Sequence, residues 1–126
     1  MSKQRILVVD DNLVNMKLVS FILQKRGYEI TTAENATETF ASVTSAPPDL
    51  ILLDLQLPEI DGYEIARRLR AEFGLRDTPI VAVTAFAMRG DEERALAAGC
   101  TAYMSKPIDT AALPALVARL LAEATK

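Results

Sequence analysis

The stretch PDLILLDLQLPEIDG, residues 48–62, decides the fold class of this 126-residue chain. Inside it the run LILL is unbroken and apolar, and a proline on each side, Pro48 and Pro58, limits its length. A run this short that is apolar on both faces is typical of a central strand in a parallel sheet. Asp54 ends the run, and an unpaired carboxylate is expensive to bury in a core. We therefore expect Asp54 to face the crevice above the sheet, where open α/β folds bind their ligands.

Apolar strand-like runs alternate with helix-like segments along the whole chain, which predicts an α/β fold with helices on both faces of a parallel sheet. We expect one domain over residues 1–126. The predicted strands cover residues 5–10, 28–33, 49–54, 78–84 and 101–105. The predicted helices lie between residues 12 and 27, 34 and 45, 62 and 73, 91 and 99, and 109 and 123. Pro114 falls inside the last helix, so its first turn is irregular or the helix begins later.

Composition narrows the possible classes of function. The net charge of −3 provides no basic surface for nucleic acid, and no apolar run approaches the length that spans a membrane, so neither partner is expected. The single cysteine, Cys100, fits a small buried residue in a reducing cytoplasm. The chain has no histidine, which argues against a zinc site and against imidazole general-base catalysis.

Polar residues follow four of the predicted strands. Asp10 and Asp11 close the first strand, Asp54 the third and Thr84 the fourth, while Lys106 follows the fifth. Because parallel strands end at one edge of a sheet, we expect these side chains to share a pocket. Taken singly, the acid pair also fits a helix cap, Thr84 an ordinary strand residue, and Lys106 a solvated loop lysine.

Three neighbouring carboxylates repel one another, so at least one pKa should rise until a cation arrives. Hard oxygen ligands suit Mg²⁺. A neutralised Asp54 can then accept a phosphoryl group, because an aspartate carboxylate can carry phosphate covalently. Phosphoryl transfer needs mainly positioning and charge stabilisation, which Lys106 and the Thr84 hydroxyl are placed to supply. No general base is needed, in agreement with the missing histidine.

Four stretches, in this order and spacing, resemble the receiver (CheY-like) domain of bacterial two-component response regulators. They are VVDDN at residues 8–12, DLILLD at 49–54, VTA at 83–85 and YMSKP at 103–107. The resemblance covers essentially the whole chain. It implies a flavodoxin-like, doubly wound sheet of five parallel strands in the order 2-1-3-4-5.

Within that family, three further stretches are similar to single-domain regulators of cell division and polarity. They are NLVNMKL at residues 12–18, QLPEI at 56–60 and TAFAMRGDEER at 84–94. Receivers attached to hybrid histidine kinases share much of the same sequence, so a receiver excised from such a kinase is the alternative. No segment follows residue 126 in the sequence, and the output is therefore expected to be a protein contact.

The resemblance also implies how the site holds its metal. Asp54 would be the phosphoacceptor, and Asp11 and Asp54 would ligate Mg²⁺ directly. Asp10 would act through water and Gln56 through its backbone carbonyl.

The same resemblance implies how the site responds. Lys106 would pair with Asp54 or its phosphate, and the bond from Lys106 to Pro107 would be cis. Thr84 would move onto the phosphate, and Tyr103 would turn inward behind it. An aromatic residue in a short strand is also compatible with simple core packing, so the role of Tyr103 depends on the family spacing.

The implied function is a phosphorelay signalling domain that catalyses only its own phosphorylation and dephosphorylation. A histidine kinase, a histidine phosphotransfer protein or acetyl phosphate would phosphorylate Asp54. The added charge would bias a surface around the fourth helix, fifth strand and last helix toward a downstream kinase or effector protein. We expect a monomer or a weak, phosphorylation-linked dimer.

Two other functions use part of the same pattern. A haloacid dehalogenase-type phosphatase also has an aspartate nucleophile, but its second acid lies two residues later, where this chain has Gln56, and its nucleophile follows the first strand. A flavodoxin-like FMN carrier would need a phosphate-binding loop after the first strand. The acidic pair Asp10 and Asp11 would repel a phosphate there.

The first predicted helix carries more apolar residues than one face can hold. The residues predicted to face the sheet are Asn15, Leu18, Val19, Ile22 and Leu23. Leu13, Val14 and Phe21 fall outside this face, so they form a docking surface for a partner helix or are partly covered by neighbouring helices. Phe86 and Met88 fit local packing and a partner surface equally well.

Overall fold

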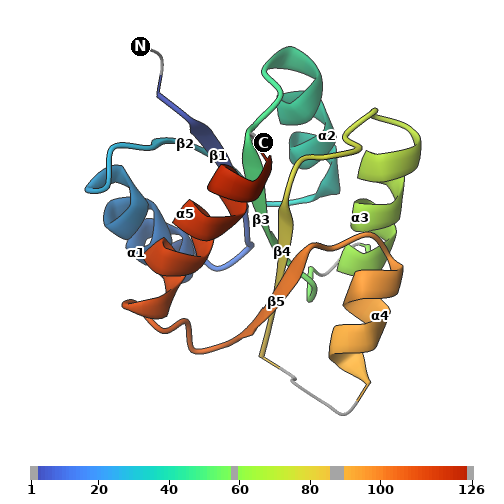
Figure 1. Ribbon diagram of the computed structural model, residues 1–126. Helices are drawn as coiled ribbons and strands as arrows, with labels where there is room; N and C mark the ends of the chain where they lie inside the picture. Colours follow the sequence, from blue (N-terminus) through green and yellow to red (C-terminus); the bar gives the residue numbers. More distant parts are fainter. Residues whose placement is uncertain (1–2, 58–59, 86–89, 125–126) are drawn as a thin grey trace.

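A computed structural model of the chain describes residues 3–57, 60–85 and 90–124 and shows helices on both faces of a parallel sheet (Figure 1). The strands are β1 (Arg5–Val9), β2 (Glu29–Ala33), β3 (Leu50–Asp54), β4 (Ile80–Thr84) and β5 (Ala102–Ser105). The helices are α1 (Leu13–Gln24), α2 (Ala36–Ser45), α3 (Gly62–Ala71), α4 (Asp91–Ala97) and α5 (Ala112–Ala124). Each predicted strand and helix is present, within a few residues of its expected bounds. Pro58, Phe86 and Met88 lie outside the described residues.

The strand order is β2-β1-β3-β4-β5, and every neighbouring pair is parallel. This confirms the doubly wound order. After β1 the chain adds β2 on one side and then crosses to β3 on the other, so the direction of winding changes between β1 and β3. The carboxyl ends of these two strands therefore flank the crevice where ligands bind in such sheets. We call this side of the sheet its carboxyl edge.

The core has two layers, one on each face of the sheet. Ile51 and Leu53 of β3 point into the layer beneath α2, α3 and α4, whereas Leu50 and Leu52 point into the layer beneath α1 and α5. All five residues of β3 are buried. A central strand covered on both faces has no solvent side, which explains why LILL is apolar throughout.

The predicted buried face of α1 wrongly included Leu18 and left out Met16. Met16, Val19 and Leu23 are the buried residues of this helix, whereas Leu18 is 44% exposed. The contact with the sheet therefore runs along the stripe through Met16, a residue that the predicted face did not include. Apolar residues occur around most of the circumference of this helix, so periodicity alone does not show which stripe of side chains faces the sheet.

Helix α5 begins later than predicted, and this places Pro114 in its first turn. The Asp109 carboxylate accepts hydrogen bonds from the N–H groups of Ala111 (2.9 Å) and Ala112 (3.0 Å), so a capped turn precedes the helix. Pro114 is the third residue of α5. Backbone N–H groups in the first turn of a helix have no acceptor within that helix, so a proline there removes no intrahelical hydrogen bond.

Gly62 allows α3 to start directly against the end of β3. Its N–H donates to the Leu55 carbonyl at 3.2 Å. A Cβ at this position would lie 2.5 Å from the Leu55 Cα and 3.0 Å from the Asp54 carbonyl oxygen. Only glycine fits such a close approach of two backbones.

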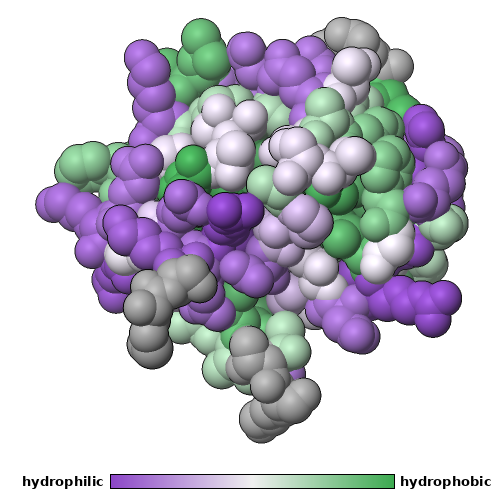
Figure 2. Space-filling view, turned by 90° about the horizontal axis from the view of Figure 1, so that it is seen from above, coloured by the Kyte–Doolittle hydropathy of each residue, from purple (hydrophilic) through white to green (hydrophobic). Residues whose placement is uncertain are grey.

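The surface mixes residue types. Seen from above, purple hydrophilic residues cover much of the left and lower parts of the view, while pale and green residues gather over its upper middle and right (Figure 2). Within the described parts of the chain, every helix is too short or too polar to cross a membrane. Cys100 is buried as predicted, and this burial raises the pKa of its thiol to about 11.

Candidate functional site

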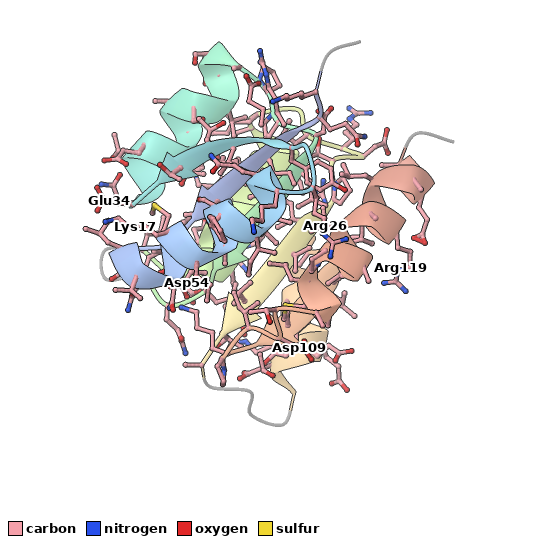
Figure 3. The ribbon with its side chains drawn as sticks, turned by 90° about the vertical axis from the view of Figure 1, so that its left-hand side faces the viewer. Lys17, Arg26, Glu34, Asp54, Asp109 and Arg119 are labelled. Carbon is pink, nitrogen blue, oxygen red and sulfur yellow. The ribbon has the colours of Figure 1, made fainter. Side chains whose placement is uncertain are left out.

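Three carboxylates meet at the carboxyl edge of the sheet. Asp10 follows β1 directly and Asp54 is the last residue of its neighbour β3, so strand pairing brings them together. One oxygen from each of Asp10, Asp11 and Asp54 lies within 4.8 Å of the other two. Asp10 and Asp54 are buried, while Asp11 is exposed. Figure 3 shows Asp54 beside the start of α1.

Lys106 supplies the positive charge at this cluster. Its Nζ lies 3.3 Å from Oδ2 of Asp10 and 3.3 Å from Oδ2 of Asp54. Its backbone N–H donates to the Thr84 carbonyl at 2.7 Å, which ties the loop after β5 to the end of β4. The bond between Lys106 and Pro107 is cis, as the resemblance implied.

The pKa of the Asp10 carboxyl is raised, as the sequence predicted for at least one of the three acids. Burial raises the pKa of the Asp10 carboxyl, and the negative charge of Asp54 raises it further. The Asn12 N–H, which donates to Asp10 Oδ1 at 2.8 Å, and the Lys106 ammonium act in the opposite direction on this pKa. Burial, rather than repulsion between carboxylates, is the largest cause.

Gln56 contacts Asp54 through its backbone and the residue after β4 through its side chain. Its backbone N–H donates to Asp54 Oδ1 at 2.9 Å. Its side-chain Oε1 accepts a hydrogen bond from the Ala85 N–H at 3.0 Å. The sequence had indicated a role only for the backbone carbonyl of Gln56, and no pattern marked its side chain.

Thr84 and Tyr103 lie on the two strands beyond Asp54. Thr84 is buried at the end of β4, one residue after Val83, the register partner of Asp54. The Tyr103 ring packs against the core layer beneath α2, α3 and α4. Its hydroxyl is buried and, within the described residues, has no hydrogen-bond partner. The switching roles of both residues remain predictions.

The cluster fits a magnesium ion on the chemistry of its donors. All three side chains offer carboxylate oxygens, the hard ligands that Mg²⁺ prefers. One oxygen of each carboxylate lies within 4.8 Å of the other two, so the three groups are close enough to face a single ion. Among the described residues, the Lys106 ammonium contributes one positive charge against three carboxylates, so negative charge is in excess there.

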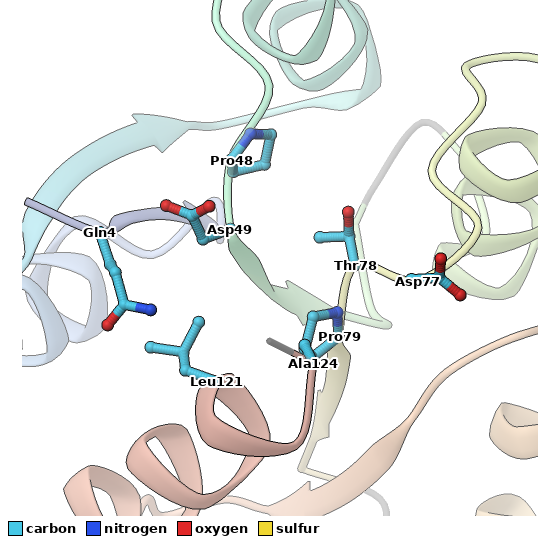
Figure 4. A pocket seen from close by; sticks show the side chains of 8 residues that line it. All are labelled: Gln4, Pro48, Asp49, Asp77, Thr78, Pro79, Leu121 and Ala124. Carbon is cyan, nitrogen blue, oxygen red and sulfur yellow. The ribbon is translucent and has the colours of Figure 1, made fainter. Parts of the chain in front are cut away.

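A hollow lies at the opposite edge of the sheet, where the strands begin. Its volume is about 180 Å³, and its lining includes Gln4, Asp49 and Thr78, from segments that precede β1, β3 and β4 (Figure 4). The Asp49 carboxylate already accepts a hydrogen bond from the Arg5 N–H at 2.7 Å. This hollow is separate from the carboxylate cluster at the carboxyl edge.

Comparison with known proteins agrees with this geometry. The chain matches the response regulator receiver domain family over residues 6–118. It is 47% identical over 103 residues to the polar-differentiation response regulator DivK of Brucella anthropi, an alignment that covers 82% of this chain and 84% of that protein. A CheY-like response regulator receiver domain protein from Methanospirillum hungatei JF-1 has a TM-score of 0.90 and 30% identity, covering 98% of both chains. The signal receiver domain of a signal transduction histidine kinase from Syntrophus aciditrophicus has a TM-score of 0.86 and 31% identity, covering 95% of this chain and 91% of that one.

Proposed function

This chain belongs to the family of response regulator receiver domains, and we propose that it carries a phosphoryl group on Asp54 in a two-component phosphorelay. Members of this family are signalling domains rather than enzymes that act on an external substrate. The observation that carries the proposal is the Lys106 ammonium, held 3.3 Å from both Asp10 and Asp54 inside the carboxylate cluster. It provides a positive charge, on a side chain only 16% exposed, beside the carboxylate that would become an acyl phosphate.

The proposed reaction is a transfer from phosphohistidine to aspartate. An oxygen of Asp54 attacks phosphorus, and the N–P bond of the donor breaks as the O–P bond forms. The Gln56 N–H orients Oδ1, and Lys106 beside Oδ2 stabilises negative charge on the transferred group. Bound Mg²⁺, held by Asp11 and Asp54 directly, by Asp10 through water and by the Gln56 carbonyl, would neutralise further charge on the phosphoryl oxygens.

The proposed output is a change in the surface formed by α4, β5 and α5. A phosphorylated hydroxyl side chain carries roughly −1.5 to −2 charges at neutral pH, and we expect a similar charge on the phosphoryl group of Asp54, where it replaces the single charge of the carboxylate. We expect the side chains of Thr84 and Lys106 to move toward the phosphoryl group. The hydrogen bond between the Lys106 N–H and the Thr84 carbonyl couples the ends of β4 and β5. A downstream kinase or effector protein would then distinguish the two states of this surface. The protein would act in the cytoplasm as a monomer or weak dimer.

Acetyl phosphate offers a direct test of this proposal. With Mg²⁺ present, the purified chain should gain one phosphoryl group, detected by intact-mass spectrometry under neutral conditions. The gain should disappear when EDTA removes the metal. A chain that stays unmodified under both conditions would contradict the proposed function.

The exposed apolar residues of α1 are the proposed docking surface for the phosphodonor. Leu13, Val14 and Phe21 are 55%, 76% and 57% exposed. Helix α1 starts two residues after Asp11, so this surface adjoins the reactive site. A hollow of about 370 Å³ beside Leu13 and Phe21 extends to Thr32 of β2. A helix that presents its histidine to Asp54 would bury these side chains.

We expect Phe21→Ala to slow phosphotransfer from the cognate histidine protein by about tenfold, the loss typical of an aromatic contact at an interface centre. Labelling by acetyl phosphate should not change, because this small donor does not touch α1. Leu96→Ala is a matched control, since Leu96 is also exposed (47%) but lies on α4. Equal slowing with both donors would contradict the docking role.

Mg²⁺ should raise the melting temperature of the protein because it neutralises the acidic cluster. At ten times its dissociation constant the ion adds about 1.4 kcal/mol to the free energy of unfolding. For a domain of this size that corresponds to a shift of about 4–6 °C. Calorimetry with and without Mg²⁺ measures the shift, which Asp11→Asn should largely remove. An unchanged wild-type melting temperature would mean that the cluster does not bind the ion.

The phosphatase alternative is disfavoured by the surroundings of Asp54. A haloacid dehalogenase-type enzyme needs an acid two residues after its nucleophile, and here the Gln56 amide at that position is bonded to the Ala85 N–H. The purified chain is therefore expected not to turn over p-nitrophenyl phosphate. The similarity to a histidine-kinase receiver keeps an excised hybrid-kinase receiver as the second candidate, and its phosphoacceptor chemistry would be the same.

A further inference from the structure

The hydrogen-bond ladder between β3 and β4 stops beside Asp54. The Leu55 N–H donates to the Val83 carbonyl at 2.9 Å, as in a regular parallel pair. If the ladder continued, the Ala85 N–H would donate to the Leu55 carbonyl. That carbonyl instead accepts from the Gly62 N–H at 3.2 Å, where α3 begins. The Ala85 N–H therefore does not reach the Leu55 carbonyl and donates to Gln56 Oε1 at 3.0 Å instead.

A single side chain therefore satisfies a backbone donor at the edge of the reactive site. Gln56 holds Asp54 Oδ1 with its own N–H and reaches across to β4 with its amide. Ala85 follows Thr84 directly and is exposed, so its N–H would meet solvent if the amide left. Free backbone N–H groups beside a phosphoryl group are suitable donors to its oxygens.

We propose that the Gln56 amide is a latch: in the unphosphorylated protein its Oε1 occupies the Ala85 N–H, and a phosphoryl oxygen on Asp54 displaces it. This inference rests on the proposed function. The exchange breaks one hydrogen bond to a neutral amide oxygen and forms one to a charged oxygen, which is a stronger acceptor. Gln56 is thus a positioning residue that controls how readily the end of β4 closes on the phosphate.

Removing the latch should favour the phosphorylated arrangement. Beryllofluoride with Mg²⁺ is the probe, because it mimics an aspartyl phosphate without needing a donor protein. Gln56→Ala should bind beryllofluoride about 2- to 10-fold more tightly than the wild type, since one ordinary hydrogen bond no longer has to break. Gln56→Glu keeps an acceptor of the same reach but adds negative charge, so it should bind the probe more weakly.

The Ala85 amide gives a second readout that needs no phosphate. In the free protein its hydrogen exchange, followed by NMR, should be slow in the wild type, faster in Gln56→Ala, and slow again in Gln56→Glu. Gln4→Ala is the matched control, because Gln4 lies by the hollow at the opposite edge of the sheet. It should change neither the exchange of Ala85 nor the affinity for beryllofluoride.

The outcomes separate the latch from the function on which it rests. If the wild type and Gln56→Ala bind beryllofluoride equally, or if their Ala85 amides exchange equally fast, the latch is overturned and the phosphoacceptor proposal stands. If the wild type does not bind beryllofluoride at all, the proposed function fails and the latch fails with it. Tighter binding together with faster exchange in Gln56→Ala supports the latch.

Discussion

Asp54→Asn is expected to abolish phosphorylation, with incorporation at least about 100-fold below that of the wild type. An asparagine amide has the shape of the carboxylate, and its Oδ1 can still accept the Gln56 N–H, but it is too weak a nucleophile to attack phosphorus. Asp10 keeps Lys106 in place on its other side. Intact-mass spectrometry after treatment with acetyl phosphate and Mg²⁺ measures the difference.

Asp49→Asn is the control for this substitution. Asp49 precedes the same strand and lies at the opposite edge of the sheet, where its carboxylate accepts the Arg5 N–H. The variant should take up phosphate at the wild-type rate, even if the lost charge lowers its stability slightly. If Asp54→Asn were still modified, the phosphate would have to be on another residue, and the assignment of Asp54 would be wrong.

Gly62→Ala is expected to damage both the fold and the site. The new Cβ would lie 2.5 Å from the Leu55 Cα, and this contact is with backbone, so no side chain can rotate to relieve it. Either α3 or the end of β3 has to shift, and Asp54 shifts with β3. We expect a loss of about 1–3 kcal/mol in the free energy of unfolding, measured by urea denaturation, together with weaker binding of beryllofluoride.

Gly74→Ala separates the two effects. Gly74 has a φ of +72° and nothing within 4 Å of an added Cβ, so alanine there is strained by its backbone conformation alone. It should lose about 1–2 kcal/mol of stability and keep the wild-type affinity for beryllofluoride. Wild-type stability in Gly62→Ala would show that the backbone contact at β3 is looser than its geometry indicates.

The strands and the carboxylate cluster were predictable because both follow from simple geometry. A short run that is apolar on both faces and bounded by prolines favours a central strand, and parallel strands must end at one edge. Asp10, Asp11, Asp54 and Lys106 therefore met as expected. The strand order was inferred from the family resemblance rather than from the residues.

Arg70 shows what such reasoning misses. An arginine in a helix is usually taken for a solvated residue, yet this one is partly buried and binds three backbone carbonyls. Its guanidinium donates to the carbonyls of Leu75 (2.7 Å), Thr78 (2.6 Å) and Gly99 (2.8 Å). The side chain thereby joins the end of α3 to the segments before β4 and β5. Burial lowers the pKa of this guanidinium. No sequence pattern predicts that Arg70 is partly buried.

The sequence by itself therefore determined which residues are buried strands and which polar groups stand at the strand ends, because hydrophobic periodicity and chain direction are local properties. Only the tertiary structure decided that α1 turns Met16 rather than Leu18 to the sheet, and that the Gln56 amide meets the Ala85 N–H. Such contacts depend on how closely two distant backbones approach. At the end of β3 that approach is set by Gly62, where a Cβ would lie 2.5 Å from the Leu55 Cα.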